Sequence, residues 1–161
     1  MWFFMYSCYF MSLVTFVSLL LAFFQSFLKF NIFSAVHVTF IILTSILYAF
    51  TETLVIFFFV GTGVSVKEYT RDHNLDHGFH KRSIAIKRKV YPPQMMNILY
   101  LTILFILVGA VDTGRFPLWV YSLLFAGCIY DYARNKVIQN QCFKENTQII
   151  LDMSGIEKQV A

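Results

Sequence analysis

One acidic residue, Glu52, stands inside a long apolar stretch that runs from about Phe33 to Val66. An ionised carboxylate in hydrocarbon is costly, so residues of this kind face protein or water rather than lipid. The length of the stretch places Glu52 near the middle of a bilayer, and the sequence offers it no cationic partner at that depth. Three roles follow: a protonated Glu52 that hydrogen-bonds to Thr or Tyr, a pairing residue for a partner subunit, or a proton or ion relay.

Polar side chains share one side of this stretch with Glu52 when about 100° is allowed for each residue. They are His37, Thr44, Tyr48, Thr51 and Thr62. Polar groups in spanning helices pack against other helices. We therefore expect either that this helix lies at the centre of a bundle, with water near Glu52, or that its polar stripe faces another subunit.

Histidines suggest two kinds of cofactor site. His73, His77 and His80 would share a face if the chain there were one continuous helix, which suggests a cytoplasmic metal site. Gly78 argues for a solvated link between two helices instead. His37 could ligate haem, but no second His or Met lies at its depth, so a hydrogen-bonded or interfacial His37 is the competing interpretation. We expect no cofactor.

A cluster of basic residues follows the second apolar stretch. It consists of Lys81, Arg82, Lys87, Arg88 and Lys89, which surround apolar residues such as Ile84 and Ile86. Such a segment contacts anionic lipid headgroups and also fixes the orientation of a membrane protein.

The elements that position these residues are membrane spans, because 58% of the 161 residues are hydrophobic and only 14% are charged. A chain this small cannot bury so much apolar surface inside itself. The sequence predicts one all-α integral membrane domain with four spans. They cover residues of about 2–28, 33–66, 93–111 and 116–133, with Pro93 in the first turn of the third.

Basic residues also predict the topology. Eleven of the 13 Lys and Arg residues lie in a segment of residues 67–91 and a tail of residues 134–161. The positive-inside rule places both, and hence both termini, in the cytoplasm or an organellar matrix. We expect helices 2 and 4 to extend into the cytoplasm and Cys142 to be labelled there. We expect the membrane to be a bacterial or organellar inner membrane.

The sequence contains no catalytic constellation, and a net charge of +4 that orientation explains gives no reason to expect a nucleic-acid partner. The leading hypothesis is a non-catalytic accessory or assembly subunit of a membrane complex, respiratory or otherwise energy-converting. Its partners would be lipids and other membrane subunits. The alternative is a small oligomeric proton- or ion-coupled transporter that uses Glu52, and a third is the metal site at His73, His77 and His80.

Overall fold

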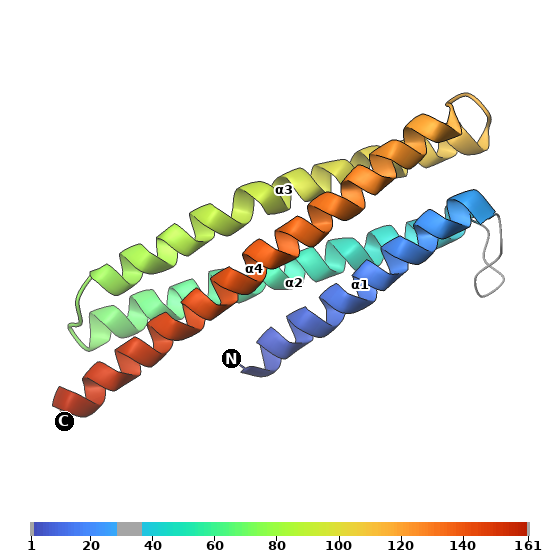
Figure 1. Ribbon diagram of the computed structural model, residues 1–161. Helices are drawn as coiled ribbons and strands as arrows, with labels where there is room; N and C mark the ends of the chain where they lie inside the picture. Colours follow the sequence, from blue (N-terminus) through green and yellow to red (C-terminus); the bar gives the residue numbers. More distant parts are fainter. Residues whose placement is uncertain (1, 29–36, 161) are drawn as a thin grey trace.

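Four long helices make up most of the computed structural model, which describes residues 2–28 and 37–160, with side-chain surroundings as far as residue 155 (Figure 1). They are α1 (Trp2–Leu28), α2 (His37–Asp72), α3 (Gly78–Asp112) and α4 (Leu118–Val160). Each helix packs on the next along the chain, and α1 also packs on α4. The result is an antiparallel up-down bundle in which α2 and α4 are diagonally opposed.

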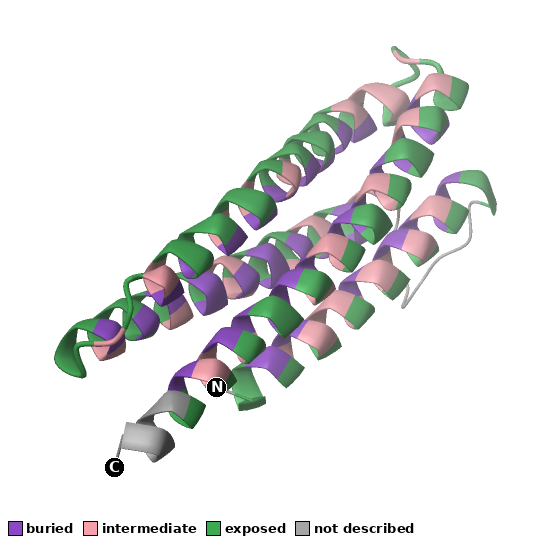
Figure 2. Ribbon diagram, turned by 60° about the vertical axis from the view of Figure 1, so that its left-hand side comes forward, coloured by how far each residue is buried: buried purple, intermediate pink, exposed green. Residues whose placement is uncertain are grey.

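A heptad pattern explains why α4 forms one unbroken helix. Apart from Ser122 and Phe143, its buried residues recur at alternating spacings of four and three, which is the seam of a coiled coil. They are Tyr121, Phe125, Cys128, Tyr132, Asn135, Gln139, Cys142, Asn146, Ile149 and Met153. Figure 2 shows buried residues along the inward side of every helix and exposed ones outside. Polar and apolar residues therefore share one seam.

Three helices, α1, α2 and α3, are long and apolar enough to cross a membrane. This confirms the coarse prediction of an all-helical chain with helices long and apolar enough to span a membrane. The apolar run of α4 is shorter, because it begins at Leu118 and meets Asp131 after Tyr130.

Residues 67–91, predicted as a polar segment between spans, are mostly helical. Only residues 73–77 form the link, because α2 continues to Asp72 and α3 begins at Gly78. Asn74 ends α2 in the left-handed conformation (φ 51°), with Leu75 N donating to Thr70 O at 2.9 Å. This is a Schellman cap. The predicted start of span 2 near Phe33 lies outside the described residues.

Pro92 and Pro93 lie inside α3 rather than at its start, which corrects the prediction that Pro93 opens a helix. Proline has no N–H, so the carbonyls of Arg88 and Lys89 lose their helical donors. The buried residues of α3 keep the heptad spacing before and after the prolines. Between them, Val90 and Gln94 are four residues apart where the heptad pattern would have three. Packing along the bundle therefore carries the helix through the prolines.

Cys142 is fully buried, and burial raises the pKa of its thiol to about 11. The expectation that it is open to labelling is therefore wrong. Cys8 and Cys128 are buried as well. The folded chain thus shields all three of its cysteines.

Candidate functional site

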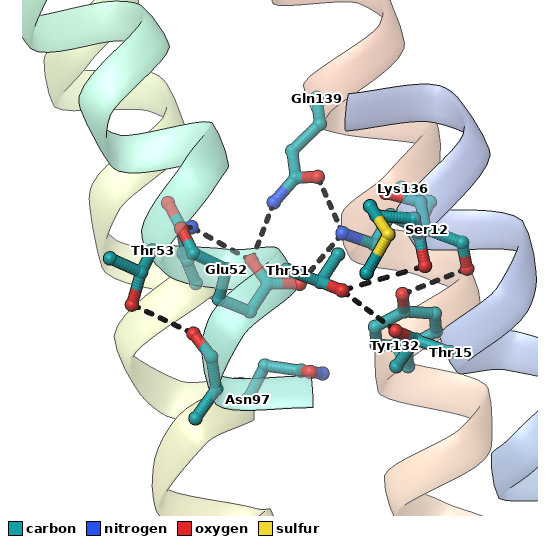
Figure 3. A network of polar contacts seen from close by, with 12 residues as sticks. Ser12, Thr15, Thr51, Glu52, Thr53, Asn97, Tyr132, Lys136 and Gln139 are labelled. Atoms are coloured by element: carbon teal, nitrogen blue, oxygen red, sulfur yellow. Dashed lines mark hydrogen bonds and ion pairs between the residues drawn. The ribbon is translucent and has the colours of Figure 1, made fainter. Parts of the chain in front are cut away.

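The Glu52 side chain is fully buried and points from α2 into the centre of the bundle (Figure 3). Its Oε1 accepts a hydrogen bond from the Lys136 ammonium at 2.6 Å. Its Oε2 accepts bonds from Gln94 Nε2 at 2.7 Å and Gln139 Nε2 at 3.0 Å. The carboxylate therefore has a cationic partner within the chain, and the expectation that it has none is wrong.

The Lys136 ammonium, like the Glu52 carboxylate, has a partner for each of its hydrogen-bonding groups. It also donates to Gln139 Oε1 at 2.9 Å and lies 4.7 Å from the centre of the Tyr132 ring. Together with Glu52, these groups give its three N–H bonds three acceptors. A buried ion pair is tolerated when such additional bonds satisfy both charges. These contacts are those of an ion pair that stabilises the bundle.

The network joins helices that are not neighbours. Glu52 lies on α2 and Lys136 on the diagonally opposed α4, so their ion pair crosses the bundle axis. Gln94 on α3 donates to the backbone oxygen of Glu52 at 2.9 Å as well as to its carboxylate. These contacts hold α2, α3 and α4 in one register.

The helix α1 attaches to the network through hydroxyl groups. Thr15 and Thr51 share a hydrogen bond at 2.7 Å, and the Tyr132 hydroxyl donates to Ser12 O at 3.1 Å (Figure 3). On the opposite side, Asn97 Nδ2 of α3 donates to the carboxylate of Asp131 at 3.0 Å. All four helices therefore meet in one polar layer.

The polar layer lies well away from the end of the bundle formed by residues 113–117. Glu52 lies 15 residues beyond the start of α2, while Gln94 and Lys136 each lie 18 residues from the ends of α3 and α4 that meet at residues 113–117. These counts correspond to about 22–27 Å of helix. A hydrocarbon layer of about 30 Å that began at that end would reach its other edge just beyond Glu52.

The polar stripe of α2 faces the other helices. Thr44, Tyr48 and Thr51 are buried with Glu52, while His37 and Thr62 are half-buried. Within the described residues, the Tyr48 hydroxyl, the Thr44 hydroxyl and both ring nitrogens of His37 make no hydrogen bond. The His37 ring lies edge-on to Tyr121, with the ring centres 6.3 Å apart.

The three histidines at the α2–α3 link do not converge. His73 stacks on Tyr69 with ring centres 4.1 Å apart, His77 precedes α3, and His80 lies in its first turn. Among residues 2–28 and 37–155, no group of three or more His, Cys, Asp or Glu side chains could hold a metal ion. The metal site remains a prediction without geometric support.

The five basic residues of α3 divide into separate contacts. Arg82 pairs with Asp152 at 2.9 Å and Lys89 with Glu145 at 2.8 Å, both on α4. Hydrogen bonds from Gln148 and Arg82 hold the pKa of Asp152 below its usual range. Lys87 turns towards α2, while Lys81 and Arg88 are exposed.

The apolar runs do not point to Gln94, Lys136 or Gln139, because Gln94 is a single polar residue at the start of the third run and the other two lie beyond the end of the fourth. The signal lies in the heptad of α4, where Asn135, Gln139 and Asn146 occupy seam positions. Polar residues at such positions face the bundle core and set register.

Comparisons with known proteins give no relative: no family model matches the chain, and neither curated proteins nor solved structures provide a match.

Proposed function

We propose that this chain is a four-span membrane protein with both termini in the cytoplasm, and that it serves as a non-catalytic accessory or assembly subunit. Two charged residues of α4 close to its apolar run support a fourth span, because they have partners inside the bundle, although Arg134 between them is exposed. Asp131 is bonded to Asn97, and Lys136 is bonded to Glu52. An intramembrane charge is tolerated when it faces the bundle and is paired.

The observation that carries the assembly role is an exposed apolar surface on α1 and α2, termed the aromatic face. It consists of Trp2, Phe3, Phe4, Tyr6, Phe10, Phe57, Val60 and Val64. Phe3 is 82% exposed and Phe10 65% exposed. At the same height, α3 and α4 carry the Lys89–Glu145 ion pair on their surface. One side of the bundle is thus apolar where the other is charged.

The bilayer alone does not account for the aromatic face. The 27 residues of α1 extend for about 40 Å, against a hydrocarbon layer of about 30 Å. Sinking all of α1 into that layer requires a tilt of about 40°, the upper limit for membrane helices. Because the helices form one bundle, this tilt would also carry charges on α3 and α4 towards hydrocarbon. A partner protein would cover the face without that cost.

A groove of about 560 Å³ adjoins the aromatic face beside the first turn of α1, between α2 and α4. Phe4, Phe57 and Met153 are among its lining residues. The hydroxyls of Thr62 and Ser65 in its wall bond to carbonyls of their own helix. The wall therefore suits an apolar side chain of a partner. Large exposed apolar patches mark interaction sites of this kind.

The test is purification of the native protein from its own membrane in mild detergent. We expect a second protein to co-purify with the wild type and to be lost from a Phe3→Ser, Phe10→Ser double variant. A Leu123→Ser variant, altered on an exposed apolar residue of α4 away from the face, should retain it. A wild-type protein that always migrates as a lone monomer would contradict the proposal.

A second candidate, a proton- or ion-coupled transporter, is supported by a different observation. Buried polar atoms without a hydrogen-bond partner among the described residues occur on several helices between Glu52 and the far end of the bundle. They belong to Thr44, Tyr48, Asn97 and Tyr121. Water between such groups would connect them to Glu52.

Glu52→Gln separates the two candidates, because Gln keeps the shape but cannot titrate. In sealed liposomes, a relay through Glu52 predicts proton flux in the wild type and none in a folded variant. An accessory subunit predicts no flux from either protein, together with intact partner binding by the variant.

A further inference from the structure

The Lys87 side chain differs from its basic neighbours. From Gly78 to Val111, α3 carries no acidic residue, and Arg82 and Lys89 reach across to acids of α4. Lys87 instead lies over Gly63 of α2, beside the hydroxyl of Ser83. Neither Lys87 nor Ser83 makes a side-chain hydrogen bond or ion pair with any residue that the structure describes. Lys87 is thus a half-buried residue beside α2 without a counter-charge among the described residues.

Gly63 makes this arrangement possible. A Cβ at Gly63 would overlap the end of the Lys87 side chain and lie 3.1 Å from Ser83 Oγ. Gly61 lies two residues away on the same helix, and a Cβ there would meet nothing within 4 Å. The missing side chain at Gly63 therefore leaves room for the end of Lys87. An added Cβ would push this flexible side-chain end away rather than move the backbone.

The depth of Lys87 matches the headgroup region. About 20 residues of helix cross the hydrocarbon, so counting back from Asp112 places the boundary near Pro92. The headgroup layer adds about 5–7 Å, or about three to five residues of helix. Lys87 and Arg88 fall at its outer part. Ser83 lies one helical turn further from the boundary, is only 3% exposed and has the Lys87 ammonium beside it. A phosphate that reaches this ammonium meets no competing carboxylate on α3.

We propose that Lys87 and Ser83, beside Gly63, form a site for the phosphate of an anionic phospholipid headgroup. The Lys87 ammonium supplies charge and hydrogen bonds, and Ser83 Oγ supplies a further donor. Arg88, exposed and next along the chain, adds to the positive potential that favours anionic over zwitterionic lipid. The site is independent of the aromatic face, so the two proposals fail separately.

The experiment titrates the purified full-length protein in detergent with phosphatidylglycerol, phosphatidylcholine or inorganic phosphate, and follows its thermal unfolding. We expect phosphatidylglycerol to raise the melting temperature most. Lys87→Gln should raise the half-saturating phosphatidylglycerol concentration about five- to tenfold. Gly63→Ala should do the same by displacing Lys87, whereas Gly61→Ala and Lys81→Gln should match the wild type.

Three outcomes would overturn the proposal. Equal losses in Lys87→Gln and Lys81→Gln would mean that only total charge matters. Equal behaviour of Gly63→Ala and Gly61→Ala would mean that the position of the ammonium is irrelevant. An equal response to inorganic phosphate would assign the site to a soluble anion. If Lys87→Gln fails to fold, the two glycine variants still decide between the outcomes.

Discussion

Replacing Lys136 with Met removes the cation from the central layer and keeps an unbranched side chain of similar length. Glu52 is then left fully buried with only its two amide donors, Gln94 and Gln139. Removing one partner of a buried ion pair costs about 3–5 kcal/mol. For a chain of this size, each kcal/mol lowers the melting temperature by about 2–4 °C. The expected fall is about 6–20 °C.

The cysteines of the chain can report its thermal unfolding. All three cysteines are buried in the folded protein. A maleimide that becomes fluorescent on reacting with thiols therefore reports unfolding in detergent as temperature rises. Ser122→Ala serves as a control, since its hydroxyl bonds only within its own helix, to Leu118 O.

A double-mutant cycle identifies the cause of the loss. Glu52→Gln alone should cost less than Lys136→Met, because the Lys136 side chain is 19% exposed and can turn towards water. The double variant should be more stable than the sum of the single losses predicts, because no buried charge remains. If Lys136→Met melts within about 2 °C of the wild type, less than 1 kcal/mol on the same scale, the reasoning about the pair is refuted.

Three further outcomes are expected. A cysteine placed at Lys81 should react with an impermeant maleimide from the cytoplasmic side and one at Thr113 only from the opposite side, while unmodified protein stays unlabelled; both reacting from one side would rule out the four-span topology. Gly114→Val should destabilise the chain by about 1–2 kcal/mol, because Gly114 has φ +70°, and unchanged melting would contradict this. The contact of Arg82 with Asp152 should weaken as pH falls through the lowered pKa of Asp152, because a carboxylate with a lowered folded-state pKa stabilises only while ionised. Hydrogen exchange near Asp152 should then speed up, and Asp152→Asn should lack that pH dependence.

The helical fold could be predicted because apolar run lengths are a local property. The bounds of α1 coincide with the predicted first span, and α2 and α4 extend beyond their apolar runs as expected. The helix through Pro92 and Pro93 could not be predicted, because local rules count each proline as a break. Packing of the heptad seams decides there, and it depends on residues far away in the sequence.

The sequence predicted the α2 side of the central site but not the residue on α4 that pairs with Glu52. The polar stripe on α2 identified Glu52 and Thr51 as inward-facing, since helical periodicity fixes which residues share a side. The partner of Glu52 was missed because Lys136 lies beyond the predicted end of the fourth span. The length of an apolar run predicts where a span ends. Which residues of two helices lie at the same level along the bundle axis depends instead on how helices of unequal length align. Nothing local to α4 encodes that alignment with α2.

Site-specific photo-crosslinking in intact cells tests the assembly role most directly. A photoreactive phenylalanine analogue at Phe10 places the probe on the aromatic face, and the same analogue at Leu123 places it on an exposed apolar part of α4. We expect a discrete crosslink to a partner protein from position 10 and none from position 123. Crosslinks only to lipid from both positions would contradict the claim that the aromatic face docks a protein.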